Sequence, residues 1–200
     1  MRSYRTEGII IKRRNFGEAD RILTVMTREY GKLQIKATGV RKITSRRSAH
    51  IELLNHTILH LYKGHTFSVL TEAKMLDDFA PVKAHFDKVG LAYHLCELID
   101  GLCPENQENG RVYFLLKRTL ADLAAQDDVS FPYGTYAAAE IDEYTLGTYG
   151  IGVSDAPRVS STQHELLQQF EISLLSELGY WHRNAATVNV DTQAMIEDIL

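Results

Sequence analysis

The side chains with the clearest chemical potential are the basic residues of one stretch, residues 36–47. It contains five cations and no acidic residue: Lys36, Arg41, Lys42, Arg46 and Arg47. Lysine and arginine side chains that gather without intervening carboxylates attract polyanions, above all the phosphate backbone of nucleic acids. Such a run is equally compatible with an ordinary solvated surface. Its meaning therefore depends on the elements that carry it.

The positive charge is confined to one part of the chain. Residues 1–80 contain 15 Lys and Arg against 8 Asp and Glu, a net charge of +7, whereas residues 81–200 contain 7 against 18, a net charge of −11. The overall charge of −4 conceals this division. A basic half followed by an acidic half indicates separate duties, and polyanion binding is expected of the first half.

The first half also carries the pattern of a small β-barrel. Polar and apolar residues alternate in segments rich in β-branched side chains, which is typical of half-buried strands. The expected strands are residues 5–14, 20–28, 33–36, 51–62 and 66–77. Short glycine turns join them, except for one basic connection near residues 40–50. Five such strands fit a closed or nearly closed antiparallel barrel, for which the OB-fold is the best candidate.

Beyond Pro81 the apolar pattern becomes helical, which divides the chain into domains at residues 1–80 and 81–200. The expected helices are residues 82–102, 112–123, 132–150, 162–178 and 191–200. The helix at 82–102 is apolar on two sides and is expected to be buried. The last pattern still runs at Leu200, as expected of a short or truncated C-terminus. The predicted fold class is α+β, an N-terminal five-stranded OB-fold β-barrel followed by an all-α helical domain.

Several motifs of the first half resemble a known family. They are Gly17–Thr24 (GEADRILT), Thr27–Lys32 (TREYGK) and Gly39–Lys42 (GVRK), extended by Tyr4–Ile10 and Leu61–Gly64. In this order they resemble the N-terminal domain of the bacterial recombination mediator family RecO; the remaining residues resemble it only loosely. The resemblance implies an OB-fold that binds single- and double-stranded DNA and anneals complementary strands. It also implies action on DNA coated by the single-strand-binding protein SSB, and loading of RecA together with RecR.

The barrel supplies the residues for such binding. OB-folds hold single strands with cations along the phosphates and aromatic rings against the bases. The predicted DNA-binding cations are Lys12, Arg13, Arg14, Arg21, Arg28, Lys36, Arg41, Lys42, Arg46, Arg47 and Lys63. Phe16, at a turn, and Tyr30, at a hairpin tip, are the predicted stacking residues. Binding of this kind is expected to be independent of sequence and strongly dependent on salt.

The resemblance also implies a partner site on the helical domain. In the RecO family the C-terminal tail of SSB contacts an apolar pocket with basic residues there. Arg111, Lys117 and Arg118 are the densest cations of the helical domain, and we predict that they contact this tail. Each of them is also compatible with an ordinary solvated helix face.

Residue types suited to catalysis or metal binding do not gather in this sequence. Glu18 and Asp20 lie two residues apart, a spacing that favours turn capping or arginine pairing over acid–base chemistry. Some members of the RecO family carry a four-cysteine zinc element, but Cys96 and Cys103 lack CxxC spacing and partners. The chain resembles the zinc-free version. We therefore expect a protein that is not an enzyme and has no metal or cofactor.

Two other functions remain open at this level. The acidic helical domain is compatible with a protein–protein adaptor in which the barrel is a passive anchor, and the same cations are compatible with an OB-fold module that binds RNA. The sequence contains no apolar run near the roughly 20 residues of a membrane helix and begins without a signal-peptide pattern. The expected location is cytoplasmic and associated with the nucleoid.

Overall fold

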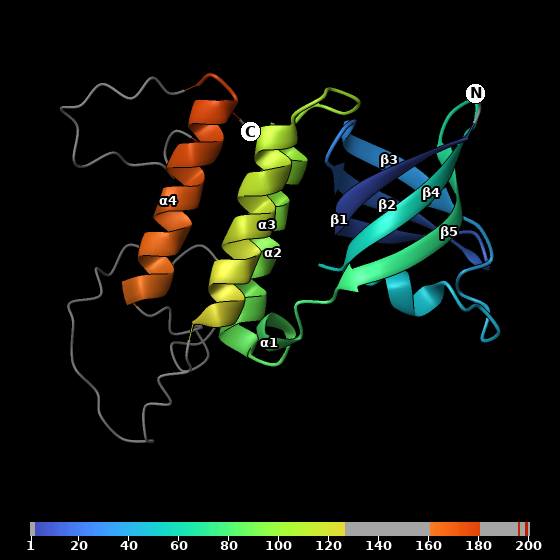
Figure 1. Ribbon diagram of the computed structural model, residues 1–200, viewed down its shortest axis with the longest axis horizontal. Coiled ribbons are helices and arrows are strands. Elements are labelled where there is room, and N and C mark those ends of the chain that lie inside the picture. Colours follow the sequence, from blue (N-terminus) through green and yellow to red (C-terminus); the bar gives the residue numbers. More distant parts are fainter. Residues whose placement is uncertain (1–2, 127–160, 181–195, 197–198, 200) are drawn as a thin grey trace.

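The computed structural model describes residues 3–126 and 161–180, together with Ile196 and Ile199. Its first part is a closed five-stranded barrel in the order β1-β2-β3-β5-β4 (Figure 1). The strands are β1 (Ser3–Phe16), β2 (Asp20–Thr27), β3 (Gly31–Ala37), β4 (His56–Lys63) and β5 (Ser68–Asp77). Helices follow the barrel in the chain and lie beside it in space. The predicted OB-fold barrel followed by a helical domain is therefore confirmed.

The barrel closes through a pairing that the sequence did not predict. β3 and β5 run parallel, with Ile35 opposite Ser68 and Lys36 opposite Val69, whereas the other pairings are antiparallel. Five strands in a closed ring cannot alternate in direction all the way round, so one neighbouring pair must be parallel. The predicted antiparallel pairing therefore holds for four of the five strand pairs, and the pair that closes the barrel is the exception.

The barrel core comes from the alternating side chains of these strands. Ile10, Leu23, Val25, Ile35 and Leu59 are fully buried inside it. At about 25 cal/mol for each Å² of buried apolar surface, such side chains supply the main favourable term in barrel stability. Residues on the opposite face of β1 and β2 are also buried, because they pack against the helices.

The fourth strand begins later than the pattern predicted. Ser48–Ile51 form a 3₁₀ helix, η1, and β4 starts only at His56. Between them Leu54 takes a left-handed conformation with φ of 68°, and its N–H donates to the carbonyl of Ile10 at 2.9 Å. This backbone cannot continue a strand. Ile51 instead packs into the barrel core, and Leu54 packs into the apolar cluster that the barrel shares with the helices.

The helical part contains α1 (Ala80–Lys83), α2 (Phe86–Leu102), α3 (Gly110–Ala125) and α4 (Ser161–Glu177). The helix expected at 82–102 is divided, because His85 is extended with φ of −122° and ψ of 122°. One side of α2 is buried as predicted, but Phe86 on the other side is 79% exposed, so the prediction of burial on both sides was wrong. Predicted elements at 132–150 and beyond Asp191 lie outside the described residues, apart from Ile196 and Ile199.

Helix α4 ends where the sequence predicts. Gly179 has φ of +83°, its N–H donates to the carbonyl of Ser176, and the N–H of Tyr180 donates to the carbonyl of Leu175. These two bonds form a Schellman motif, which needs a left-handed residue and therefore favours glycine. Within the described residues, no helix is long and apolar enough to cross a membrane.

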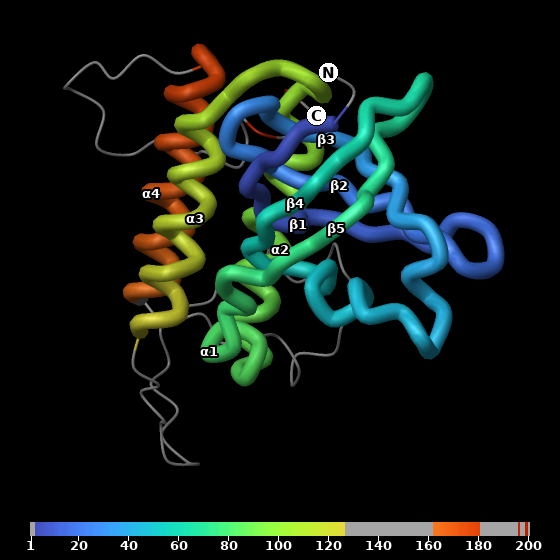
Figure 2. The backbone as a smooth tube through the Cα atoms, turned by 45° about the vertical axis from the view of Figure 1, so that its right-hand side comes forward, coloured from blue at the N-terminus to red at the C-terminus, as the bar shows by residue number. Residues whose placement is uncertain are grey.

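The barrel and the helices share a second core. Ile9 and Ile11 of β1 and Met26 of β2 pack on Leu95 of α2 and Leu116 of α3, among other residues of that apolar cluster. Figure 2 shows α2 and α3 running past the barrel wall formed by β1 and β2. The buried apolar surface between the barrel and the helices makes them one structural unit rather than two independent domains joined by a linker.

The connection between α2 and α3 lies along strand β3. The N–H of Asn106 donates to the carbonyl of Lys32 at 2.9 Å, and Lys32 pairs with Glu105 in a short parallel bridge. The ammonium group of Lys32 is buried and donates to the carbonyl oxygen of Asp100, while the carboxylate of Asp100 lies 3.6 Å away. This connection therefore covers the first half of β3.

A buried polar contact completes the junction. Nε2 of His56 lies 2.8 Å from the hydroxyl of Tyr113, which in turn donates to the carboxylate of Glu7 at 3.2 Å. Burial lowers the pKa of His56 below its ordinary value of 6.5, the charge of Lys117 lowers it further, and Glu7 and Asp77 act in the opposite direction. Neutral histidine is therefore the form that the folded protein prefers.

We expect the free energy of unfolding to decrease as the pH falls below 6.5, because the unfolded chain then binds a proton that folded His56 resists. This contribution is complete above 6.5 and continues to fall until the lowered pKa of the folded state is reached. Urea unfolding between about pH 7.5 and about pH 5.5 measures it. A His56→Gln variant, which does not titrate, should show a flatter dependence; an identical dependence would contradict the assignment.

Candidate nucleic-acid interface

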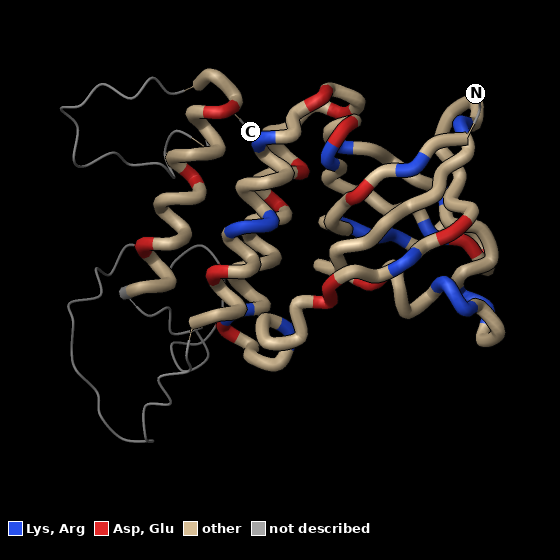
Figure 3. The backbone as a smooth tube through the Cα atoms, in the orientation of Figure 1, with Lys and Arg blue, Asp and Glu red and all other residues tan. Residues whose placement is uncertain are grey.

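Six of the predicted DNA-binding residues come together at the end of the barrel that points away from the helices. We call this surface the basic end; it consists of Arg14, Phe16, Lys36, Arg41, Lys42 and Arg46. They come from the last residues of β1, the end of β3 and the connection from β3 to β4. In Figure 2 this connection and the turn between β1 and β2 project from the side of the barrel opposite the helices. Figure 3 shows blue Lys and Arg segments gathered on this loop.

Strand register places the first three of these residues on one face. Arg14 is opposite Ile22 and Ile22 is opposite Lys36, so Arg14 and Lys36 lie on the same side of three neighbouring strands. Nζ of Lys36 lies 4.9 Å from the ring centre of Phe16, which is 44% exposed. An exposed ring with a cation beside it is the arrangement by which OB-folds stack a base and hold its phosphate.

Hydrogen bonds hold the loops of the basic end in place. The N–H of Arg41 donates to the carbonyl of Ala19 and its guanidinium donates to the carbonyl of Gly17, each at 3.0 Å. The N–H of Gly39 donates to the carboxylate of Asp20 at 2.8 Å. These bonds join the turn between β1 and β2 to the connection between β3 and β4, so the cations are presented on a defined surface.

Asp20 has the structural role that the sequence favoured for it. The hydrogen bond from Gly39 lowers the pKa of its carboxyl, and Lys36, whose Nζ lies 3.1 Å from Oδ2, lowers it further. The partners of Asp20 are the Lys36 side chain and the N–H of Gly39 rather than an arginine. The ion pair with Asp20 holds the ammonium group of Lys36 over the ring of Phe16.

Arg47 belongs to the same stretch but serves the fold. Its guanidinium donates to the carbonyl oxygens of Leu70 at 2.8 Å, Thr71 at 3.3 Å and Thr38 at 2.8 Å. Three carbonyl acceptors use most of the donors that a phosphate contact requires. Arg47 therefore fastens the basic connection to β5, and its neighbour Arg46 is exposed.

We expect Arg47→Ala to lower the free energy of unfolding by about 1 to 3 kcal/mol, because three carbonyls lose a charged donor. Arg46→Ala removes the same charge from an exposed site and should change stability by no more than about 0.5 kcal/mol. Urea unfolding of the two variants measures the difference. Equal stabilities would show that the carbonyl contacts of Arg47 do not hold the loop in solution.

Other predicted cations also have partners inside the molecule. Lys12 forms an ion pair with Asp100 of α2. Arg13 and Arg21 both pair with Glu52, which follows η1. These ion pairs join the barrel to α2 and to the segment that follows η1. The structure does not bring them into the basic end.

The predicted residues Arg28 and Tyr30 lie at the opposite end of β2. The guanidinium of Arg28 is 5.5 Å from the ring centre of Phe114 on α3 and 3.8 Å from Glu29. Tyr30 packs edge to face on Tyr4 at a centroid distance of 4.9 Å. Since Phe16 borders the start of β2 and Tyr30 follows its end, the two predicted stacking residues do not share a surface.

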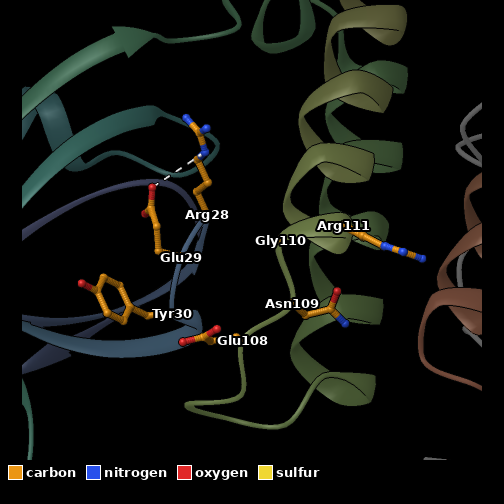
Figure 4. Close-up of a pocket in the computed structure, with 7 residues that line it drawn as sticks. All are labelled: Arg28, Glu29, Tyr30, Glu108, Asn109, Gly110 and Arg111. Carbon is orange, nitrogen blue, oxygen red and sulfur yellow. Dashed lines mark ion pairs between the residues drawn. The ribbon is translucent and has the colours of Figure 1, made fainter.

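Arg28, Tyr30 and the predicted partner residue Arg111 do line one open pocket of about 660 Å³. Figure 4 shows it between the β2–β3 hairpin and the start of α3, with Arg111 turned away towards α4. Glu29 and Glu108 also line it, so the positive charge is balanced. This pocket therefore fits a polyanion less well than the basic end does.

The remaining predicted residues are placed separately. Lys63 ends β4, where neighbouring Tyr62 pairs with Ser3 at the start of β1. On α3, exposed Arg111 and Arg118 are seven residues apart and share a face, and they pair with Glu177 and Asp122.

Lys117 is half-buried and lies roughly 100° around the helix from Arg118, and its charge contributes to the lowered pKa of His56. The set of three predicted partner cations is therefore divided between two faces of the helix. Exposed Phe114, which lies between Arg111 and Arg118 in the chain, was missed by the sequence analysis. An aromatic residue between two cations, on the polar side of a helical pattern, was the available signal.

A zinc element does not fit the cysteines of this chain. Burial raises the pKa of Cys96 to about 12 and that of Cys103 to about 11. Thiols that stay protonated at neutral pH are poor zinc ligands. Among the described residues, no group of three or more His, Cys, Asp and Glu side chains comes together.

Comparison with known families gives a consistent result. A model described as "Recombination protein O N terminal" matches residues 1–79, and a model described as "Recombination protein O C terminal" matches residues 84–134. The first covers the barrel, and the second begins at the helices.

Similar curated proteins carry the name "DNA repair protein RecO". The one from Roseiflexus sp. (strain RS-1) is 38% identical over 141 residues, which are 70% of this chain and 50% of the relative. The one from Symbiobacterium thermophilum is 28% identical over 195 residues, or 98% of this chain and 64% of the relative. The one from Heliobacterium modesticaldum is 41% identical over 106 residues, which are 53% of this chain and 39% of the relative.

The chain thus spans between 39% and 64% of the length of these three relatives. The two models of one family together match well over half of the chain, first the barrel and then the helices. The relatives align with both parts. The chain therefore belongs to the RecO family.

Proposed function

We propose that this chain acts in DNA repair as a DNA-binding recombination mediator and that it works by binding rather than by catalysis. The observation that carries the proposal is the basic end, where Lys36 lies by the exposed ring of Phe16 and further cations of β1 and of the β3–β4 connection share the same end of the barrel. A surface of this kind neutralises phosphates and stacks a base without reading the sequence. Other members of the family are named "DNA repair protein RecO", which agrees with this role.

The covering of β3 supports the basic end as the contact surface. OB-folds commonly bind oligonucleotides on strands 2 and 3 with their adjoining loops. Here the connection from α2 to α3 occupies the first half of β3, through Glu105 and Asn106. The second half, with Lys36, stays accessible beside the turn that follows Phe16. The remaining predicted cations of the barrel stay predictions as DNA contacts.

The mediator role includes partners that the family resemblance implies. In the proposed role the protein binds single- and double-stranded DNA. It anneals complementary strands because phosphates that it has neutralised no longer repel each other. It acts with RecR on DNA coated by SSB and so helps RecA to load. The C-terminal tail of SSB would contact the face of α3 that carries Arg111, Phe114 and Arg118. Such work takes place in the cytoplasm, at the nucleoid.

Fluorescence anisotropy with labelled single-stranded DNA tests the proposal. For the full chain we expect binding at about 50 mM salt that weakens steeply towards about 300 mM, because binding releases counterions from the DNA. Competition with RNA of the same sequence separates DNA from RNA preference. A folded protein that binds no DNA at the lower salt concentration would overturn the proposal and favour an adaptor that acts through the acidic helical domain.

A further inference from the structure

The loop of the basic end presents one apolar side chain that the fold does not use. Ile43 has a relative exposure of 105%, whereas Val40 of the same loop is completely buried. A fully exposed isoleucine contributes nothing to the core, although burial of such a side chain would be favourable. Single exposed apolar residues are common on protein surfaces. The surroundings of Ile43 are what give this one a meaning.

The backbone holds Ile43 at a defined place. The N–H of Lys42 donates to the carbonyl of Gly39 at 3.3 Å, and the N–H of Ser45 donates to the carbonyl of Lys42 at 2.9 Å. Ile43 is therefore in the second of two successive turns. The loop is anchored on one side by Arg41 and on the other by Arg47, through the carbonyl contacts described above. An anchored loop loses little conformational entropy when its tip meets a ligand.

The charge around Ile43 favours a polyanion. No acidic residue occurs from Lys32 to Ile51 in the sequence. Lys42 and Arg46 flank Ile43 and are exposed, and no hydrogen bond or ion pair of the described residues engages their side chains. Nucleic acid offers what this tip requires, since apolar base faces lie behind a row of phosphates. A protein partner would need an apolar patch surrounded by many acidic residues to match the same tip.

We propose that Ile43 is a wedge that inserts between neighbouring bases of DNA whose phosphates are held by Lys42 and Arg46. The inference rests on the proposed function and specifies how the same surface engages its ligand. Inserted apolar side chains unstack one base step, at an expense of a few kcal/mol that is smallest where the bases are already single-stranded. The wedge therefore favours single strands and opened duplexes, the substrates of an annealing protein.

The test compares the unchanged 200-residue chain with Ile43→Ser and with a control, Leu76→Ser. Leu76 is another exposed apolar residue, 44% exposed on β5 and outside the basic end. One measurement is anisotropy with single-stranded DNA over a salt series. The other is the fluorescence of 2-aminopurine placed within the same DNA, which rises when the base loses its stacking neighbours.

We expect Ile43→Ser to weaken binding about tenfold without changing the salt slope, since a buried apolar contact is lost and no phosphate contact is. The 2-aminopurine signal should fall towards that of free DNA, and Ile43→Leu should restore both properties. Leu76→Ser should behave as wild type. If Ile43→Ser bound DNA as wild type does and gave the same 2-aminopurine signal, the wedge proposal would be overturned and the proposed function would stand. Wild type that fails to bind DNA would overturn the proposed function as well.

Discussion

Replacing Arg14, Lys42 and Arg46 together by alanine is expected to weaken the binding of single-stranded DNA about a hundredfold at low salt. These cations are exposed, and no hydrogen bond or ion pair of the described residues engages their side chains. Each neutralises a phosphate in the proposed complex, so their loss should also reduce the salt slope by about 2. Anisotropy titrations at several salt concentrations measure both quantities. Because no hydrogen bond or ion pair within the described part of the chain uses these side chains, the fold should be unaffected.

A matched control separates local contacts from net charge. Lys74→Ala, Arg111→Ala and Arg118→Ala together remove the same three charges from exposed positions outside the basic end. This variant should keep most of the affinity and the full salt slope. If both triple variants lost affinity equally, binding would depend on the overall charge, and the basic end would not be the DNA site.

The second large effect concerns the junction between barrel and helices. Gly31→Ala is expected to lower the free energy of unfolding by about 3 to 4 kcal/mol. Gly31 has φ of +66°, and a Cβ added there would lie 1.7 Å from the carbonyl oxygen of Gln107. Both the β2–β3 hairpin and the connection from α2 to α3 would have to move, because the obstacle is backbone rather than a flexible side chain. Urea unfolding followed by circular dichroism measures the loss.

Gly17→Ala is the control for backbone conformation alone. Gly17 has φ of +59°, but an added Cβ would meet nothing within 4 Å. Only the left-handed conformation is penalised there, at about 1 to 2 kcal/mol. If the two variants lost the same stability, the connection would not pack on Gly31 in solution. A larger loss for Gly31→Ala would support the packing of the α2–α3 connection on the first half of β3. That packing is one reason for placing the DNA site at the basic end.

The sequence by itself determined most of the strands and helices that the structure describes. Alternation around Leu33 and Ile35 predicts strand β3, and Gly31 and Gly179 mark a hairpin and a helix end, because each signal is local and acts over a few residues. The concentration of positive charge in residues 1–80 is likewise visible without a structure. The parallel closure and the late start of β4 were not visible, since both depend on how distant strands meet.

Only the tertiary structure decided which of the predicted residues work together. Arg46 and Arg47 are neighbours in the chain, yet one is exposed and the other holds three carbonyls on two segments. Lys12 forms an ion pair with Asp100, which lies 88 residues away in the sequence. An ion pair forms with whatever group the fold brings near, and no local pattern records that partner. For the same reason the exposure of Ile43 became visible only once the barrel had closed beneath it.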